Sequence, residues 1–282
     1  ALSWLGRSYR AAGEPGKAVS LHRQALDIGE KLRDQFWIWR ARLNMATTYA
    51  TTGEWKLARE NLEMQSSGGF TEHQVSMQVE VQTGYFEAAR GHVEAISTTA
   101  VDLFDDTHEN EALFARLYLA NIAGSRPSSL PETLGLLPGD FPVGRRYLKI
   151  QRAAAVANAQ DRTRAAAAYE LLAPHKGMLG LLDSSLSDRV LGRLAVLEGD
   201  FPRAAQHFDH ALSFLRRAGY RPDLAWTCHD YAEMLLAASG PLDRLKAAAL
   251  LDEGERIAFE LDMKPLVEKL AALRGKLLAR RG

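Results

Sequence analysis

The residues of this chain whose types and spacing could perform chemistry include two histidines on one segment. His207 and His210 lie three positions apart with Asp209 between them, a spacing that could place two metal ligands on one helix face. Zinc needs three or four ligands, and no Cys or His pair elsewhere is spaced to complete such a set. The sequence therefore favours two solvent-facing histidines beside a core Phe208, and we expect no metal and no other cofactor.

A second candidate is the run Cys228, His229 and Asp230, which has the composition of a nucleophilic triad. Consecutive residues of a helix point about 100° apart, so these three side chains cannot converge on one another. We expect Cys228 to be a small buried thiol that packs between helices.

The segment Gly13 to Ala18, Gly-Glu-Pro-Gly-Lys-Ala, has some features of a phosphate-binding loop. That motif needs an earlier glycine and a Ser or Thr after the lysine, and Ala11 and Ala18 stand in those places. A turn between two helices is the better interpretation. Because no nucleophile is paired with a base, we expect the chain not to be an enzyme.

The elements that would position these residues are repeated along the chain. The set Gly6, Tyr9, Gly13, Ala18 and Ala25 returns forty residues later as Ala46, Tyr49, Gly53, Ala58 and Gln65. Further copies contain Gly192, Gly199, Ala204, Phe208 and Ala211; Ala153, Ala165, Tyr169 and Leu172; and Ala232, Leu235, Ala247 and Leu251. Small residues at fixed spacing let antiparallel helices approach closely, so each copy predicts a helix–turn–helix hairpin.

These residues resemble the tetratricopeptide repeat, with Leu5-Gly6, Tyr9, Gly13, Ala18 and Ala25 fitting its pattern. The position that is usually aromatic late in the second helix is His22 in the first copy and Phe208 in a later one. The resemblance implies an all-α, tetratricopeptide-like α-α superhelix, a right-handed solenoid of about seven hairpins. We expect one solenoid over residues 1–282, with a helix over 110–123, an irregular junction near 124–144 and a capping helix over 264–282.

A narrower resemblance rests on residues 161–273, which include Arg-Pro-Asp-Leu-Ala-Trp-Thr-Cys-His-Asp at 221–230. This stretch is similar to the C-terminal helical-repeat region of large bacterial signalling ATPases linked to adenylate or guanylate cyclase, kinase or LuxR-like DNA-binding domains. The resemblance implies a scaffold or regulatory module that binds a protein segment or a domain of its own parent chain. The alternative is a small-molecule-sensing arm that controls a linked ATPase, cyclase or transcription output.

The inner, concave face of such a superhelix is the expected partner-binding surface. Projection of the first helix of each hairpin onto this face gives Arg7, Arg10, Arg40, Arg189, Arg193, Trp226 and His229. Guanidinium groups suit carboxylates or phosphates on a peptide, a tail or a small effector. The alternative is that these arginines pair with Glu and Asp of adjacent hairpins.

The composition limits the kinds of binding partner and the cellular compartment that we expect for this chain. Lys plus Arg and Asp plus Glu are equal at 35 each, so no global charge attracts nucleic acid or an anionic membrane. The single cysteine excludes an internal disulfide, and no apolar run is long enough to span a bilayer. We therefore expect a soluble, cytoplasmic protein without nucleic-acid or membrane partners. Because Ala1 already lies in a helical pattern, we expect a fragment of a longer chain.

Overall fold

The structure is a computed structural model that describes residues 1–63, 90, 149–150, 153–180, 186–238 and 241–279. The named helices are α1 (Leu2–Ala11), α2 (Pro15–Leu32), α3 (Gln35–Thr52), α4 (Trp55–Glu63), α9 (Ala165–Leu172), the 3-10 helix η3 (Ala173–His175), α10 (Ser187–Glu198), α11 (Phe201–Ala218), α12 (Arg221–Ala238), α13 (Pro241–Glu260) and α14 (Lys264–Ala279). In these ranges there is no strand, and Leu179 and Leu186 form an isolated bridge. The expected helix over 110–123 and junction near 124–144 lie outside the described residues.

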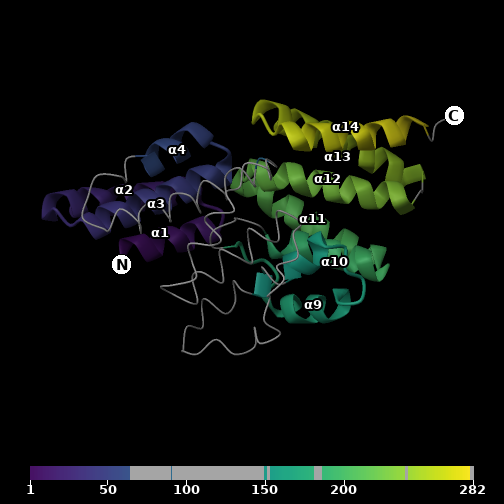
Figure 1. The fold of residues 1–282 in the computed structure, drawn as a ribbon, viewed down its shortest axis with the longest axis horizontal. Coiled ribbons are helices and arrows are strands. Elements are labelled where there is room, and N and C mark those ends of the chain that lie inside the picture. Colours follow the sequence, from purple (N-terminus) through teal and green to yellow (C-terminus); the bar gives the residue numbers. More distant parts are fainter. Residues whose placement is uncertain (64–89, 91–148, 151–152, 181–185, 239–240, 280–282) are drawn as a thin grey trace.

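Consecutive helices pack as antiparallel hairpins, and the hairpins stack in chain order (Figure 1). The pairs α1–α2, α3–α4 and α10–α11 each have a short turn between their helices, and α12 packs on α13 in the same way. The last helix, α14, buries Leu266, Leu270, Leu273 and Leu277 against α12 and α13. This arrangement confirms an all-α, tetratricopeptide-like fold with a C-terminal capping helix.

Local sequence signals set the bounds of these helices, as α11 illustrates. Asp200 caps its start by accepting a hydrogen bond from the backbone N–H of Arg203, and Pro202 occupies the first turn. Gly219 ends the helix with a left-handed φ of 71°. Between these ends the buried residues are Ala204, Phe208, Ala211, Leu212, Leu215 and Ala218, which form one apolar stripe.

Within a hairpin, a small residue of the first helix meets a large ring of the second. A Cβ on Gly192 would lie 2.8 Å from Cε1 of Phe208, and a Cβ on Gly6 would lie 2.4 Å from Cε1 of His22. Both rings are fully buried, and each follows its glycine by sixteen positions. The structure therefore confirms that His22 and Phe208 occupy the same place in two copies of the repeat.

His22 differs from Phe208 because its imidazole is polar. Both ring nitrogens are buried without a hydrogen-bond partner among the described residues. Burial, and then the charges of Arg10 and Arg7, lower the pKa of His22 to about 4 from its ordinary 6.5. The folded chain therefore holds this imidazole in its neutral form.

We expect His22 to make the free energy of unfolding depend on pH. The unfolded chain binds the proton near pH 6.5 and the folded chain near pH 4, so the free energy of unfolding is undiminished above pH 6.5 and falls between these values by roughly 3 kcal/mol. The substitution His22→Phe should remove this loss and raise stability at every pH. Urea unfolding at pH 7, 5.5 and 4 measures it, and parallel pH profiles of His22→Phe and the parent would contradict it.

The helices α1–α4, the N-terminal group, contact the helices α9–α14, the C-terminal group, through turns at their ends (Figure 1). Gly13, in the turn after α1, has a φ of 84°, and a Cβ there would lie 3.0 Å from the Cβ of Ala218. Gly53, after α3, has a φ of 88°, and a Cβ would lie 2.8 Å from Cδ2 of Leu261. Both positions require glycine because of the left-handed turn and the close contact.

Two hydrogen bonds complete this contact between the groups. The hydroxyl of Tyr220 donates to the backbone oxygen of Arg10. The indole Nε1 of Trp55 donates to the backbone oxygen of Leu261 at 3.0 Å. Residues that are more than two hundred positions apart in sequence are therefore held side by side.

Candidate binding surface on the first helices

The predicted binding residues lie in both helix groups. Arg7, Arg10 and Arg40 belong to α1 and α3, whereas Arg189, Arg193, Trp226 and His229 belong to α10 and α12. The side of α10 and α12 that carries these last four residues is called the first-helix wall below. It is the part of the predicted set that the structure brings together.

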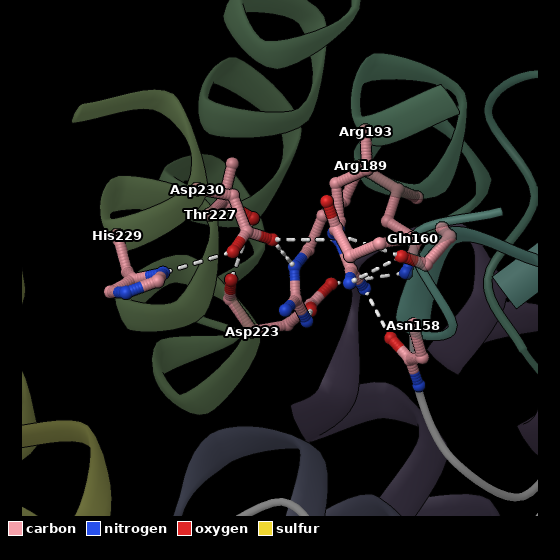
Figure 2. A network of polar contacts seen from close by, with 10 residues as sticks. Asn158, Gln160, Arg189, Arg193, Asp223, Thr227, His229 and Asp230 are labelled. Carbon is pink, nitrogen blue, oxygen red and sulfur yellow. Dashed lines mark hydrogen bonds and ion pairs between the residues drawn. The ribbon is translucent and has the colours of Figure 1, made fainter. Parts of the chain in front are cut away.

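Arg189 is the centre of the first-helix wall, and it lies between two carboxylates of α12 (Figure 2). Its Nε donates to Oδ2 of Asp230 and its Nη1 to Oδ1 of Asp223, both at 2.8 Å. The arginine side chain is 14% exposed, and the two aspartates are 10% and 11% exposed. Oδ2 of Asp223 also accepts from the backbone N–H of Leu186 at 3.0 Å, which fixes the start of α10.

Arg193, one turn further along α10, extends the network to the preceding hairpin (Figure 2). Its Nη1 donates to Oδ1 of Asn158 at 2.6 Å and its Nη2 to the backbone oxygen of Ala157 at 3.3 Å. Its Nε also lies 3.7 Å from Oδ2 of Asp230. Three successive first helices are therefore linked by one chain of polar contacts.

The charges of this network balance, and they set the protonation of its carboxylates. Burial opposes ionisation of Asp230, but Arg189 and Arg193 outweigh it and hold the pKa of this group well below its usual range. Burial raises the pKa of Asp223, and Arg189 offsets this only in part. Because desolvation is large for all four groups, removal of one partner would leave a buried charge unpaired.

Trp226 and His229 flank the network on α12. The guanidinium of Arg189 lies 5.5 Å from the ring centroid of Trp226, which is half-buried. Nδ1 of His229 lies 3.0 Å from Oδ1 of Asp230, and the two rings of Trp226 and His229 meet edge to face at 6.0 Å. The arginines here pair with carboxylates of the adjacent hairpin, as the alternative interpretation of the sequence described.

The arginines of the N-terminal group have different surroundings. Arg10 is 4% exposed and lies where Tyr220 contacts α1. Arg7 and Arg40 are half-buried, and the guanidinium of Arg7 lies 4.8 Å from the ring centroid of Trp4. Arg7 and Arg40 therefore belong to other helices than those that carry the network around Arg189.

A polar cluster around His207 was not predicted from the sequence. The expectation that His207 faces solvent was wrong. His207 is 12% exposed rather than solvent-facing, because its Nε2 lies 2.8 Å from the hydroxyl of Tyr169 and its Nδ1 3.3 Å from Oδ1 of Asp188. His210 is 71% exposed, as expected. Asp188 also accepts from the backbone N–H of Gly177 at 2.5 Å. Asp188 lies in the first turn of α10, and the packing of α10 on α11 brings it to His207, a contact that the spacing of residues within one helix does not reveal.

This cluster has a structural role in the described chain. It joins α9, the loop after it, α10 and α11 through side-chain and backbone contacts. Within the described ranges, no group of three or more His, Cys, Asp or Glu residues is arranged to hold a metal ion.

Cys228 is fully buried on α12, and its Sγ lies 3.7 Å from Oε2 of Glu253 on α13. Burial, and then the charge of Glu253, raise the pKa of its thiol. His229 points to Asp230 instead, so the three consecutive residues do not converge on one site.

We expect the native thiol of Cys228 to be unreactive at pH 8. A chromogenic disulfide reagent should modify it only at the rate at which the chain unfolds, and should titrate one thiol in 6 M guanidinium chloride. Full modification within minutes under native conditions would contradict this prediction.

The stacked hairpins, the small residue under each ring and the capping helix define a tetratricopeptide-like helical-repeat protein. Residues 1–36, which cover α1, α2, the following turn and the first two residues of α3, match the family model described as tetratricopeptide repeat. No curated protein matches the chain. Tetratricopeptide repeats generally mediate contacts between proteins. None of the helices in the described part of the chain is both long and apolar enough to cross a membrane.

Proposed function

We propose that this chain is a non-catalytic protein-interaction module, the scaffold or regulatory arm of a cytoplasmic bacterial signalling protein. In this proposal it binds a protein segment, or a domain of its own parent chain, through the first helices of its hairpins. The observation that carries the proposal is the network of Arg189, Arg193, Asp223 and Asp230, which fixes the spacing of successive first helices without a partner. A surface that is already ordered loses little entropy when it binds.

The predicted residues have two roles in this proposal. Arg189, Arg193 and His229 shape the first-helix wall through their contacts with carboxylates. The half-buried Trp226 on that wall, and Arg7 and Arg40 in the N-terminal group, have exposed surface with which to contact an extended segment. An aromatic ring and guanidinium groups together suit a partner that carries carboxylates and apolar side chains.

A labelled peptide of eight glutamates with a central Leu tests this proposal, with the corresponding lysine peptide as the control ligand. We expect the glutamate peptide to bind, and affinity to fall when NaCl rises from 50 to 500 mM. The double variant Arg7→Ala/Arg40→Ala should weaken binding by about tenfold, which corresponds to about 1.4 kcal/mol. Fluorescence anisotropy measures these affinities.

Arg256→Ala is the matched control, because this side chain is 60% exposed on α13, the second helix of its hairpin, and is not one of the proposed binding residues. Equal affinity of the parent, the double variant and this control would remove the arginines of α1 and α3 from the binding surface.

A further inference from the structure

The first hairpin, α1 with α2, holds a buried imidazole that the proposed function does not use. His22 of α2 is fully buried, and neither of its ring nitrogens has a hydrogen-bond partner in the described part of the chain. The backbone of Gly6 lies directly against the ring, since a Cβ there would lie 2.4 Å from Cε1 and 2.8 Å from both nitrogens. A proton on His22 would therefore place a charge inside the contact between α1 and α2, where no solvent reaches it.

Neither of the helices α1 and α3, which both pack on α2, can balance that charge. Neither helix contains an Asp or a Glu, and their ionisable side chains are arginines and tyrosines only: Arg7, Tyr9, Arg10, Arg40, Arg42 and Tyr49. The charges of Arg10 and Arg7 act on the His22 ring and, with burial, lower its pKa. An imidazolium at this position would therefore meet repulsion from α1 and no opposite charge from α3.

The acidic residues on and next to α2 lie in solvent or have other partners. Asp27 and Glu30 are exposed, and Oε1 of Glu30 lies 3.3 Å from Nη2 of Arg42. Glu14, which precedes the helix, pairs with Lys17. The fold thus gives the imidazole a place that suits only its neutral form.

The corresponding position in the hairpin of α10 and α11 does not titrate. There Phe208 lies against Gly192 as His22 lies against Gly6, and its ring is also fully buried. A titratable group at this position of the repeat therefore distinguishes the first hairpin from its later copy.

The first hairpin also joins the two helix groups. The fully buried Tyr220 donates its hydroxyl hydrogen to the backbone oxygen of Arg10, near the end of α1. Beyond that end, the turn at Gly13 approaches Ala218 of α11. Because the backbone of Arg10 moves with α1, separation of α1 from α2 would break this hydrogen bond.

We propose that the first hairpin is an acid-sensitive element of the fold: a proton on His22 separates α1 from α2 and breaks the link of α1 to Tyr220, while the C-terminal group stays folded. Arg7 of the proposed binding surface lies on α1, but this proposal does not depend on the proposed function.

Native-state hydrogen exchange of the full chain at pH 7.5 and pH 5 tests the proposal. The amides of α1 and α2 should be less protected than those of α11 and α12. The open hairpin binds the proton near pH 6.5 and the closed hairpin near pH 4, so the protection factors of α1 and α2 should fall about 30-fold at pH 5. Urea below the unfolding transition should change their exchange less than that of α11 and α12, because a local opening exposes less surface.

Two results would overturn the proposal. Equal protection and equal urea dependence along the chain would mean that α1 and α2 open only when the whole chain unfolds. Protection factors of α1 and α2 that are the same at pH 7.5 and pH 5 would mean that acid does not act on this hairpin.

Variants at two histidines assign the acid effect to one side chain. In His22→Phe the loss of protection at pH 5 should disappear, and His22→Leu, which also cannot take a proton, should give the same result. His210→Phe is the matched control, because its side chain is 71% exposed on α11, and it should behave as the parent chain does. A 30-fold loss that persists in both His22 variants would overturn the proposal.

Tyr220→Phe tests the link between the groups. It keeps the buried ring and removes the hydroxyl that contacts Arg10. Because the open hairpin lacks this hydrogen bond, the variant should lower the protection of α1 by about fivefold at both pH values. Unchanged protection of α1 would show that the bond survives the opening, and would overturn that part of the proposal.

Discussion

Replacement of Arg189 by Met is expected to lower the free energy of unfolding by about 3–5 kcal/mol. The guanidinium contacts Asp223 and Asp230, whose side chains are 11% and 10% exposed, and its loss leaves two carboxylates with far less compensating charge. The methionine fills most of the volume, so the effect reports charge rather than a cavity. Urea unfolding at pH 7, followed by circular dichroism, measures the change.

Arg256→Met is the matched control, because this arginine is exposed and pairs with Glu260 one turn away on α13. We expect it to change stability by less than about 0.5 kcal/mol. The double variant Arg189→Met/Asp223→Asn should recover much of the loss, since Arg193 and Asp230 then remain as a balanced pair. If Arg189→Met were as stable as Arg256→Met, the network would not hold the first helices together.

Replacement of Phe208 by Ala should cost about 3–5 kcal/mol, because it leaves a large cavity in the centre of the C-terminal group. The ring is fully buried, covers Gly192 and stacks on Tyr231 with centroids 5.1 Å apart. Phe259→Ala on α13 removes a ring that is 80% exposed, and it should change stability by less than about 0.5 kcal/mol. Similar losses in both variants would contradict this account of the core.

A double-mutant cycle tests the contact between Gly192 and Phe208 directly. Gly192→Ala alone should destabilise by about 1–3 kcal/mol, because its Cβ would lie 2.8 Å from the ring. In a Phe208→Leu background the same change should cost measurably less, since the smaller side chain makes room for the methyl group. Strict additivity of the two changes would show that the glycine is required for another reason.

The core of each hairpin could be predicted from sequence because its physical cause is local. A small residue and a bulky one sixteen positions later must meet across a helical hairpin of fixed turn length, and Gly6–His22 and Gly192–Phe208 do so. The same reasoning predicted that Gly13 and Gly53 lie in turns. It did not predict that both turns contact the C-terminal group, because Ala218 and Leu261 are far away in sequence.

The candidate site was predicted less completely. Helical periodicity placed Arg189, Arg193, Trp226 and His229 on the first helices, and the structure brings them together. Periodicity gives the direction of a side chain but does not identify its partner on the neighbouring hairpin. The pairing of Arg189 with Asp223 and Asp230 therefore stayed one of two alternatives. His207 was misplaced for the same reason, because Tyr169 and Asp188 reach it from other elements.

The sequence by itself determined the helical hairpins, the small-to-large contacts inside them and the apolar stripe of the capping helix. Each of these depends on residues within one hairpin, where helix geometry determines which side chains contact each other. Only the tertiary structure decided which charges are buried as pairs and which turns join the two helix groups. These features depend on how neighbouring hairpins are placed, and no periodicity within one hairpin specifies that placement.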